Sequence, residues 1–296
     1  MIAVIINPSA GRARRVPVHE RAALASAIVE RHGERAEVFV TERPGHACEL
    51  AKASVARGAT LVVAWGGDGT INDVASALAF GERAAMGIVP AGSGNGLARA
   101  LRIDPRPERA LTDALAATPR RIDVGELGGR LFVNVAGVGF DAHVAARFNA
   151  PDNHIRGLAG YALLTAGGLM SYAPQRYEIT SAGRTRSVRA LLVAFANGTE
   201  FGNQIRIAPG SSVDDGALDL VVVEERSRLV TLWNMRRLLT QSIERAPIWS
   251  CERVTDATIE SDAPMTFHVD GEPVAGGTRL QVRTHAGALR VCVGPP

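Results

Sequence analysis

The first 120 residues of the chain alternate short, β-branched apolar runs with stretches whose apolar residues recur at helical spacing. The runs predict buried strands at Ile2–Ile6, Ala36–Thr41, Thr60–Trp65 and Ala84–Val89. The stretches between them predict helices at Pro17–His32, Gly45–Arg57, Thr70–Phe80 and roughly Asn95–Leu101. Because strands that alternate with helices build a mostly parallel sheet with covered faces, this part of the chain predicts an α/β domain.

The pattern changes after about Arg121, where strand-like runs follow one another and many alternate apolar with polar residues. These runs are Leu131–Val135, Tyr177–Ser181, Val188–Ala196, Ala217–Val223, Val254–Glu260, Met265–Val269, Arg279–Arg283 and Ala288–Val293. Two stretches with helical spacing interrupt them, at about Arg156–Ser171 and Arg228–Ile243. We therefore predict a second, β-rich domain.

The net charge and the cysteines indicate which partners and which cellular compartment to expect. A net charge of +3 is too small to indicate a nucleic-acid partner. Cys48, Cys251 and Cys292 lie far apart and form no CxxC pair, so we expect a reducing, cytoplasmic setting. The N-terminus lacks the features of a signal peptide, and no apolar run reaches the ~18–20 residues of a membrane span. Any membrane contact is therefore expected to be peripheral.

A polar loop follows each of the four strands predicted in the first domain. The loops are Asn7–Gly11, Thr41–Gly45, Gly66–Thr70 and Pro90–Asn95. In an open α/β sheet, ligands bind outside the carboxyl ends of the strands, where such loops converge. The four loops together therefore predict one ligand-binding crevice.

The loop Gly66-Gly67-Asp68-Gly69-Thr70 has the chemistry of a phosphate site. Glycines let the backbone approach phosphates closely, and the N-terminus of a helix favours anions. Because a carboxylate there repels phosphate unless a cation intervenes, Asp68 is expected to bind Mg²⁺ or a water network. A plain turn between strand and helix is the alternative. Lys52 is the only lysine and lies within a predicted helix, which excludes a Walker A loop and a protein kinase.

Together with Ile71-Asn72, this loop resembles the nucleotide loop shared by diacylglycerol kinases, sphingosine kinases, NAD kinases and 6-phosphofructokinases. Further segments resemble those of the diacylglycerol kinase catalytic domain, in order and nearly from end to end. They are Ile6–Gly11, Pro90–Asn95 with Leu97-Ala98-Arg99, Asn134–Asp141, Ala208-Pro209, Val213–Leu218 and Asp270-Gly271-Glu272. Ala10 stands where the family usually has Ser, and Gly96 where eukaryotic members usually have Asp. The chain thus resembles the bacterial lipid kinases of this superfamily.

The resemblance implies a fold and a reaction. The α/β domain over residues 1–122 is expected to bind ATP and to be rejoined by a C-terminal strand at about 286–296. The β-rich, sandwich-like domain over 123–285 is expected to bind the lipid, whose hydroxyl receives the γ-phosphate with Mg²⁺ present. The residues expected at the nucleotide are Asn7, Pro8, Ser9, Gly11, Thr41, Gly66, Gly67, Asp68, Gly69, Thr70, Asn72, Ser93 and Asn95.

The resemblance also assigns acidic residues of the second domain. Asp270 is the first choice for the catalytic base, with Glu272 beside it, and Asp123 matches an acid linked to Asp68 through metal or water. A structural Mg²⁺ is implied at the Asp215 side chain and the carbonyls of Ser212 and Ala217. From the residues alone, Asp270-Gly271 also fits a hairpin turn between Met265–Val269 and Arg279–Arg283, and Asp214–Gly216 fits a bare turn.

Two other functions remain open on the same fold. An NAD kinase would share the loop at Gly66–Thr70, although Asp214–Leu218 and Asp270–Glu272 favour the lipid branch. The second is a non-catalytic lipid- or nucleotide-binding regulator. The presence of the acidic residues Asp68, Asp123, Asp270 and Glu272 argues against it. A sphingosine-type substrate also remains open. We expect a lipid partner at a membrane surface, and the oligomeric state, including a homodimer, is left open.

Overall fold

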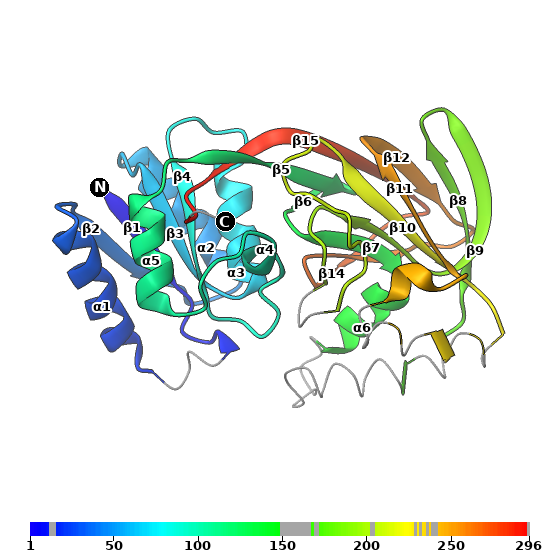
Figure 1. The fold of residues 1–296 in the computed structure, drawn as a ribbon, viewed down its shortest axis with the longest axis horizontal. Coiled ribbons are helices and arrows are strands. Elements are labelled where there is room, and N and C mark those ends of the chain that lie inside the picture. Colours follow the sequence, from blue (N-terminus) through cyan, green and yellow to red (C-terminus); the bar gives the residue numbers. More distant parts are fainter. Residues whose placement is uncertain are drawn as a thin grey trace. The chain divides into compact units, whose positions relative to one another are not determined.

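The computed structural model describes residues 1–11, 16–148, 167–168, 172–201, 205–227, 230, 233–234, 237 and 242–294. The chain divides into two compact units (Figure 1). The first unit comprises Met1–Ile122 and Gly287–Pro296, and the second comprises Asp123–Ala286. Two strands, β5 (Arg120–Leu127) and β15 (Arg279–Val291), each begin in one unit and end in the other.

The first unit is built on a parallel sheet in the order β4-β3-β1-β2. Its strands are β1 (Ile2–Ile6), β2 (Ala36–Val40), β3 (Leu61–Gly66) and β4 (Ala85–Pro90). Its helices are α1 (Val18–Arg31), α2 (His46–Ala56), α3 (Asp68–Leu78), α4 (Gly96–Ala100) and α5 (Pro107–Ala116). Val291 at the end of β15 pairs in parallel with Met86, so the C-terminal segment extends this sheet beyond β4.

Helices cover both faces of this sheet (Figure 1). Right-handed crossovers require α1 to lie on the face opposite α2 and α3, because the chain moves from β1 to β2 in one direction and back past β1 to β3. Helix α1 packs beside α5, and α2 packs beside α3. Strands β1, β3 and β4 are buried along their whole length, as expected for parallel strands covered on both sides.

The strand order places a topological switch point between β1 and β3, because the chain leaves these two strands in opposite directions. In sheets of this kind, the crevice outside the carboxyl ends of the strands at the switch point is where ligands bind. The loops that follow β1 and β3 border this crevice, and the second of them is the loop that the sequence predicts to hold phosphate.

The second unit is mostly antiparallel, and β15 borders one end of the strand order β14-β13-β7-β9-β8-β12-β15. Besides β5 and β15, its strands are β6 (Arg130–Phe132), β7 (Val135–Gly139), β8 (Gln175–Ser181), β9 (Arg184–Ala196), β10 (Leu218–Glu224), β11 (Trp249–Val254), β12 (Asp256–Glu260), β13 (Thr266–Val269) and β14 (Glu272–Ala275). Helix α6 (Phe140–Phe148) follows β7. The first half of β9 pairs with β8, and its second half pairs with β7 and β10.

The strands of the second unit contribute the buried side chains of its apolar core. Phe132, Tyr177, Phe195 and Phe267 are among its fully buried side chains. The structure confirms the predicted fold class, an α/β part with a parallel sheet and a β-rich, sandwich-like part.

Several elements differ from the sequence predictions. Helix α3 begins at Asp68, two residues earlier than predicted. The predicted strands at 279–283 and 288–293 form the single strand β15, which continues from one unit into the other although Gly287 has a positive φ of 59°. Helix α5 was not predicted. The predicted helices at 156–171 and 228–243 lie mostly outside the described residues. None of the described helices has both the length and the apolar character needed to span a membrane.

Candidate active site

The loops after β1, β3 and β4 meet at van der Waals contact in the first unit. A Cβ atom added to Gly11 would lie 2.4 Å from the carbonyl oxygen of Ala91. One added to Gly92 would lie 2.7 Å from Cα of Gly67. Since real Cβ atoms do not approach this closely, only glycine permits these backbones to lie together. The three loops therefore converge as the sequence predicts.

The first loop is tied to the third strand's loop through Asn7. The Nδ2 group of Asn7 donates to Oγ1 of Thr70 at 2.9 Å, and Oδ1 of Asn7 accepts the N–H of Ser9 at 2.9 Å. The buried Arg21 of α1 donates to the carbonyl oxygens of Asn7 and Pro8 at 3.1 and 3.3 Å. These contacts hold the backbone of the first loop in one conformation beside the switch point.

Asp68 ties the third strand's loop to the fourth. Its carboxylate accepts the N–H groups of Asn95 and Gly96 at 2.8 and 2.7 Å. Desolvation raises the pKa of the Asp68 carboxyl above its ordinary value, and these two N–H groups act in the opposite direction. Asp68 therefore joins the first turn of α3 to the start of α4, and its role as a ligand of Mg²⁺ or water stays a prediction.

Asn95 closes the fourth loop on itself. It has a left-handed backbone (φ 54°), which asparagine tolerates better than most residues. Its Oδ1 accepts the N–H of Gly92 and its Nδ2 donates to the carbonyl of Gly92, both at 2.9 Å. Ser93 lies exposed at the tip of this loop. The braces of Asn7, Asp68 and Asn95 make the three loops one connected structure.

Backbone donors are available where these loops meet. Helix α3 has 11 residues and begins after Gly67, and no side chain within the described residues caps it. The first N–H groups of a helix have no partner inside it, so they are suited to bind an anion. Thr41 is buried and its N–H donates to the carbonyl of Ile6 at 2.9 Å, which places it next to the first loop. Asn72 lies half-buried one turn into α3.

Asp68→Asn is expected to weaken ATP binding about 5- to 150-fold, because the amide NH₂ then faces a backbone N–H and an unsatisfied donor costs ~1–3 kcal/mol. Titration calorimetry with ATP and Mg²⁺ measures the change. Asp73→Asn, on the same helix, is the matched control and is expected to bind ATP as the wild type does. Equal affinity of the Asp68→Asn variant and the wild type would contradict the bracing role.

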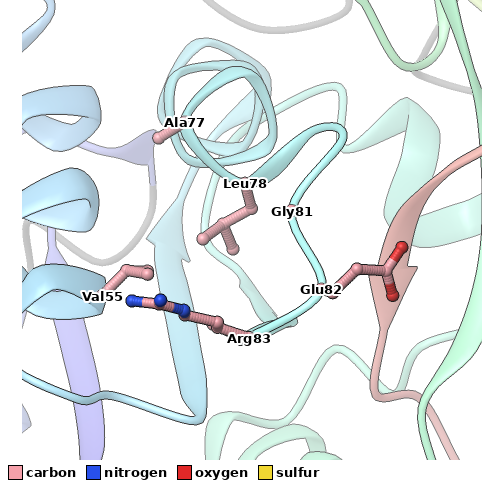
Figure 2. A pocket seen from close by; sticks show the side chains of 7 residues that line it. Val55, Ala77, Leu78, Gly81, Glu82 and Arg83 are labelled. Carbon is pink, nitrogen blue, oxygen red and sulfur yellow. The ribbon is translucent and has the colours of Figure 1, made fainter.

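A separate hollow lies at the other end of α3 (Figure 2). Its lining residues are Val55, Ala77, Leu78, Gly81, Glu82, Arg83 and Ala84. The volume, about 280 Å³, is below the ~300–1,000 Å³ typical of ligand pockets. Because α3 runs from Asp68 to Leu78, the hollow lies at the end of the helix away from the glycine loops. It therefore lies apart from the candidate site at the glycine loops.

Asp270 lies in the second unit, at a two-residue turn between β13 and β14. Its carboxylate accepts three backbone N–H groups, from Val133 at 2.9 Å, Asn134 at 2.9 Å and Val135 at 3.0 Å. Asp270 and Gly271 have φ values of 48° and 86°, the left-handed pair that a type I′ hairpin turn requires. The hairpin reading of Asp270-Gly271 is therefore correct, although the partner strand is Glu272–Ala275 rather than Arg279–Arg283.

Glu272 follows this turn as the first residue of β14 and pairs with Val269. Its side chain is exposed, whereas Asp270 is half-buried. The two neighbouring acids therefore differ in their surroundings. The Asp270 carboxylate is engaged by the backbone of the segment before β7, and the Glu272 carboxylate faces solvent.

Asp123 is buried at the start of the second unit, with 2% of its surface exposed. Its Oδ2 accepts the N–H of Gly216 at 2.7 Å, and its own N–H donates to the carbonyl of Val213 at 2.6 Å. Its carbonyl accepts Nδ2 of Asn197 at 3.0 Å. Asp123 thus supports the turn at 213–217 from within the unit.

The turn at 213–217 contains the residues for which the resemblance implies Mg²⁺. Oδ2 of Asp215 lies 2.6 Å from Nη2 of Arg253, and Oδ1 of Asp215 accepts the N–H of Ala217 at 3.2 Å. The hydroxyl of Ser212 donates to Oδ1 of Asp214 at 2.6 Å. Because Arg253 already pairs with the Asp215 carboxylate, a metal ion at this turn would have to displace that ion pair, and the implied site stays a prediction.

Mg²⁺ without nucleotide is therefore expected to leave the melting temperature of the protein unchanged, as differential scanning fluorimetry can show. Arg253→Ala is expected to cost at most about 1 kcal/mol, the usual magnitude for an exposed ion pair. Arg279→Ala, which removes a comparable exposed pair with Glu260, is the matched control. A Mg²⁺-dependent rise in the melting temperature that Asp215→Asn abolishes would contradict this prediction.

Some residues at these sites were not predicted from the sequence. Arg21 stands on the apolar side of α1 with Ala25 and Ile28, and an arginine on such a face is a signal that could have been used. The contacts of Arg253 with Asp215 and of His268 with Asp141 join residues far apart in the sequence. No local pattern indicates them.

Two families of known proteins match the two parts of the chain. Residues 1–127 match the family model of the diacylglycerol kinase catalytic domain. Residues 134–293 match that of the YegS C-terminal NAD kinase beta sandwich-like domain. A probable lipid kinase YegS-like protein from Chromohalobacter salexigens is 32% identical over 248 residues, which are 83% of this chain and 80% of that protein.

Solved structures show the same fold. A diacylglycerol kinase from Bacillus anthracis str. Sterne matches with a TM-score of 0.75 at 19% identity, over 99% of this chain and 97% of that one. An NAD kinase from Archaeoglobus fulgidus in complex with ATP matches with a TM-score of 0.54 at 14% identity, over 99% and 93%. At these identities the likeness concerns the fold alone. On the two family matches and the identity to its relatives, the chain belongs to the YegS-like lipid kinases, a family with a diacylglycerol kinase catalytic domain.

Proposed function

We propose that the protein transfers the γ-phosphate of ATP to a hydroxyl group of diacylglycerol or a related lipid, with Mg²⁺ accompanying the nucleotide. One observation carries the proposal: three glycine loops are braced together at the uncapped N-terminus of α3, in a chain of a lipid kinase family. This arrangement suits the phosphates of a nucleotide.

The nucleotide is expected to bind through backbone rather than through lysine. With Lys52 as the only lysine, the donors are expected to come from the first N–H groups of α3, in the loop at 66–70, because several N–H groups at 7–11 and 91–95 are engaged in the braces. Mg²⁺, when bound with ATP, supplies the charge that neutralises the phosphates. The carboxylate of Asp68 contributes by fixing the start of α3 to the loop at 91–95 and the start of α4.

We assign the proton acceptor to Glu272 and the anchoring role to Asp270. A carboxylate that accepts several backbone N–H bonds is stabilised in its charged form, which makes it a weak base. Asp270 accepts three such bonds, so we prefer Glu272 as the base, although the family resemblance favours Asp270. The exposed Glu272 can approach a substrate hydroxyl, and phosphoryl transfer needs such a group to orient the attacking oxygen and accept its proton.

The lipid substrate implies a peripheral contact with a membrane, because diacylglycerol resides in the bilayer. Flotation of the protein with vesicles that contain diacylglycerol tests this contact. The NAD kinase alternative is less well supported, since that likeness is one of fold, whereas the family matches are to lipid kinases.

The direct test is phosphate transfer in mixed micelles. Purified protein with labelled ATP and Mg²⁺ is expected to label diacylglycerol in a panel that also contains monoacylglycerol, sphingosine and ceramide. A parallel reaction with NAD and a coupled assay for NADP detects the alternative activity. Absence of label in every lipid would overturn the proposal. NADP formation without lipid labelling would show that the protein is an NAD kinase.

A further inference from the structure

His268 is a buried titratable residue that the proposed transfer does not use. It lies in β13, two residues before Asp270, with 3% of its surface exposed. Its Nε2 atom lies 3.1 Å from Oδ2 of Asp141, and its Nδ1 atom accepts the N–H of Gly271 at 3.3 Å. The ring therefore connects the turn that precedes Glu272 with the start of α6.

The hydrogen-bond partners determine which ring nitrogen carries the proton. A backbone N–H can only donate, so Nδ1 of His268 is the acceptor and has no proton. The proton is then on Nε2, which donates it to Asp141. The other oxygen of Asp141 accepts the N–H of Ala142 at 2.8 Å. The backbone of α6 therefore fixes the Asp141 carboxylate, and the carboxylate fixes the orientation of the His268 ring.

Gly137 provides the space for this contact. It lies in β7 directly opposite His268. A Cβ atom on Gly137 would lie 2.5 Å from Oδ2 of Asp141 and 2.8 Å from the carbonyl oxygen of Val193. Only a residue without a side chain lets the carboxylate reach the ring. Gly137, Asp141 and His268 thus form one built arrangement, which we call the histidine brace.

The histidine brace restrains the turn at Gly271, in addition to the Asp270 anchor and the pairing of Glu272 with Val269. Gly271 separates Asp270 from Glu272, and a glycine has more backbone freedom than any other residue. The three N–H bonds to Asp270 fix the turn up to this glycine. The bond from Gly271 to His268 is a restraint on the residue directly before Glu272.

We propose that His268 is a positioning residue, which fixes through Gly271 the direction in which Glu272 presents its carboxylate to the lipid hydroxyl. This inference rests on the proposed function. A misplacement of about 1 Å at a reacting group can reduce a rate by about 10²-fold, so a single hydrogen bond at this point has a large effect. His268 itself does not touch the substrate.

Two variants separate the two contacts of the ring. In His268→Asn the side-chain oxygen takes the place of Nδ1 and can accept the N–H of Gly271, but the side chain does not reach Asp141. In His268→Gln the side-chain NH₂ reaches Asp141, but a methylene group takes the place of Nδ1 and cannot accept the N–H of Gly271. We expect His268→Gln to lower kcat about 10- to 100-fold with the KM values for ATP and lipid little changed. His268→Asn is expected to keep most of the wild-type kcat.

The matched control is His285→Gln, because His285 also pairs with a carboxylate of this unit, Glu126 at 2.7 Å, but lies in β15 and not at the turn. It is expected to keep the wild-type kcat. Since His268→Asn leaves Asp141 buried without the ring, the double variant Asp141→Asn/His268→Asn is measured as well. Equal kcat values in the Asn and Gln variants, or a loss confined to the Asn variant, would overturn the positioning role.

A spectroscopic measurement tests the geometry without any assay of activity. In protein labelled with ¹⁵N-histidine, the His268 ring is expected to show the neutral form with the proton on Nε2. A proton on Nδ1 would refute the proposed contact with Gly271. If the wild type labels no lipid while the NMR result holds, the proposed function fails; if it labels lipid while His268→Gln keeps full kcat, only the positioning role fails.

Discussion

Glu272→Gln is expected to lower kcat for lipid phosphorylation about 10²- to 10⁴-fold, the contribution typical of a general base. The amide keeps the size of the side chain and removes its ability to accept a proton. Because Glu272 is exposed at the start of β14, the free energy of unfolding is expected to change by no more than about 0.5 kcal/mol. Initial rates in diacylglycerol micelles and urea unfolding measure the two effects.

Asp270 serves as the comparison for this prediction. If Glu272→Gln retains wild-type kcat while Asp270→Asn loses it without a loss of stability, the two roles are reversed. Glu178→Gln, a substitution on β8 in the same unit, controls for the loss of one negative charge.

Asp270→Ala is expected to destabilise the second unit by about 3 kcal/mol or more, since each hydrogen bond to a charged group contributes ~1.5–3 kcal/mol and three are lost. The N–H groups of Val133, Asn134 and Val135 would lose their common acceptor beside the buried start of β7. Alanine is also poorly suited to the positive φ of this position. Urea unfolding followed by tryptophan fluorescence gives the change in free energy.

Asp270→Asn separates the charge from the backbone conformation. Asparagine tolerates the left-handed region, and its single oxygen can still accept part of the N–H set, so a smaller loss of stability is expected. Asp262→Ala, at an exposed position before β13, is the control and is expected to unfold as the wild type does. A loss below about 1 kcal/mol for Asp270→Ala would show that its carboxylate is not the anchor.

The first unit was predictable almost element by element. Runs such as Ile2–Ile6 and Leu61–Gly66 are apolar throughout because parallel strands are buried on both faces, and this burial leaves a pattern in a single sequence. The second unit was predicted less completely. Short strands such as Glu272–Ala275, which is largely exposed, have too few buried positions to show any period.

The candidate site, too, was predictable from the sequence only in part. Sequence alone determined which loops carry glycine and acid, and through the order of strands and helices it determined that these loops end at one edge of a sheet. The partners of the acids came only from the tertiary structure. Asp68 finds its N–H donors 27 and 28 residues away, and Asp270 finds its donors more than 130 residues away. A hydrogen bond between distant segments depends on the folded positions of both, and no local pattern records which carboxylate anchors a turn and which remains exposed to react.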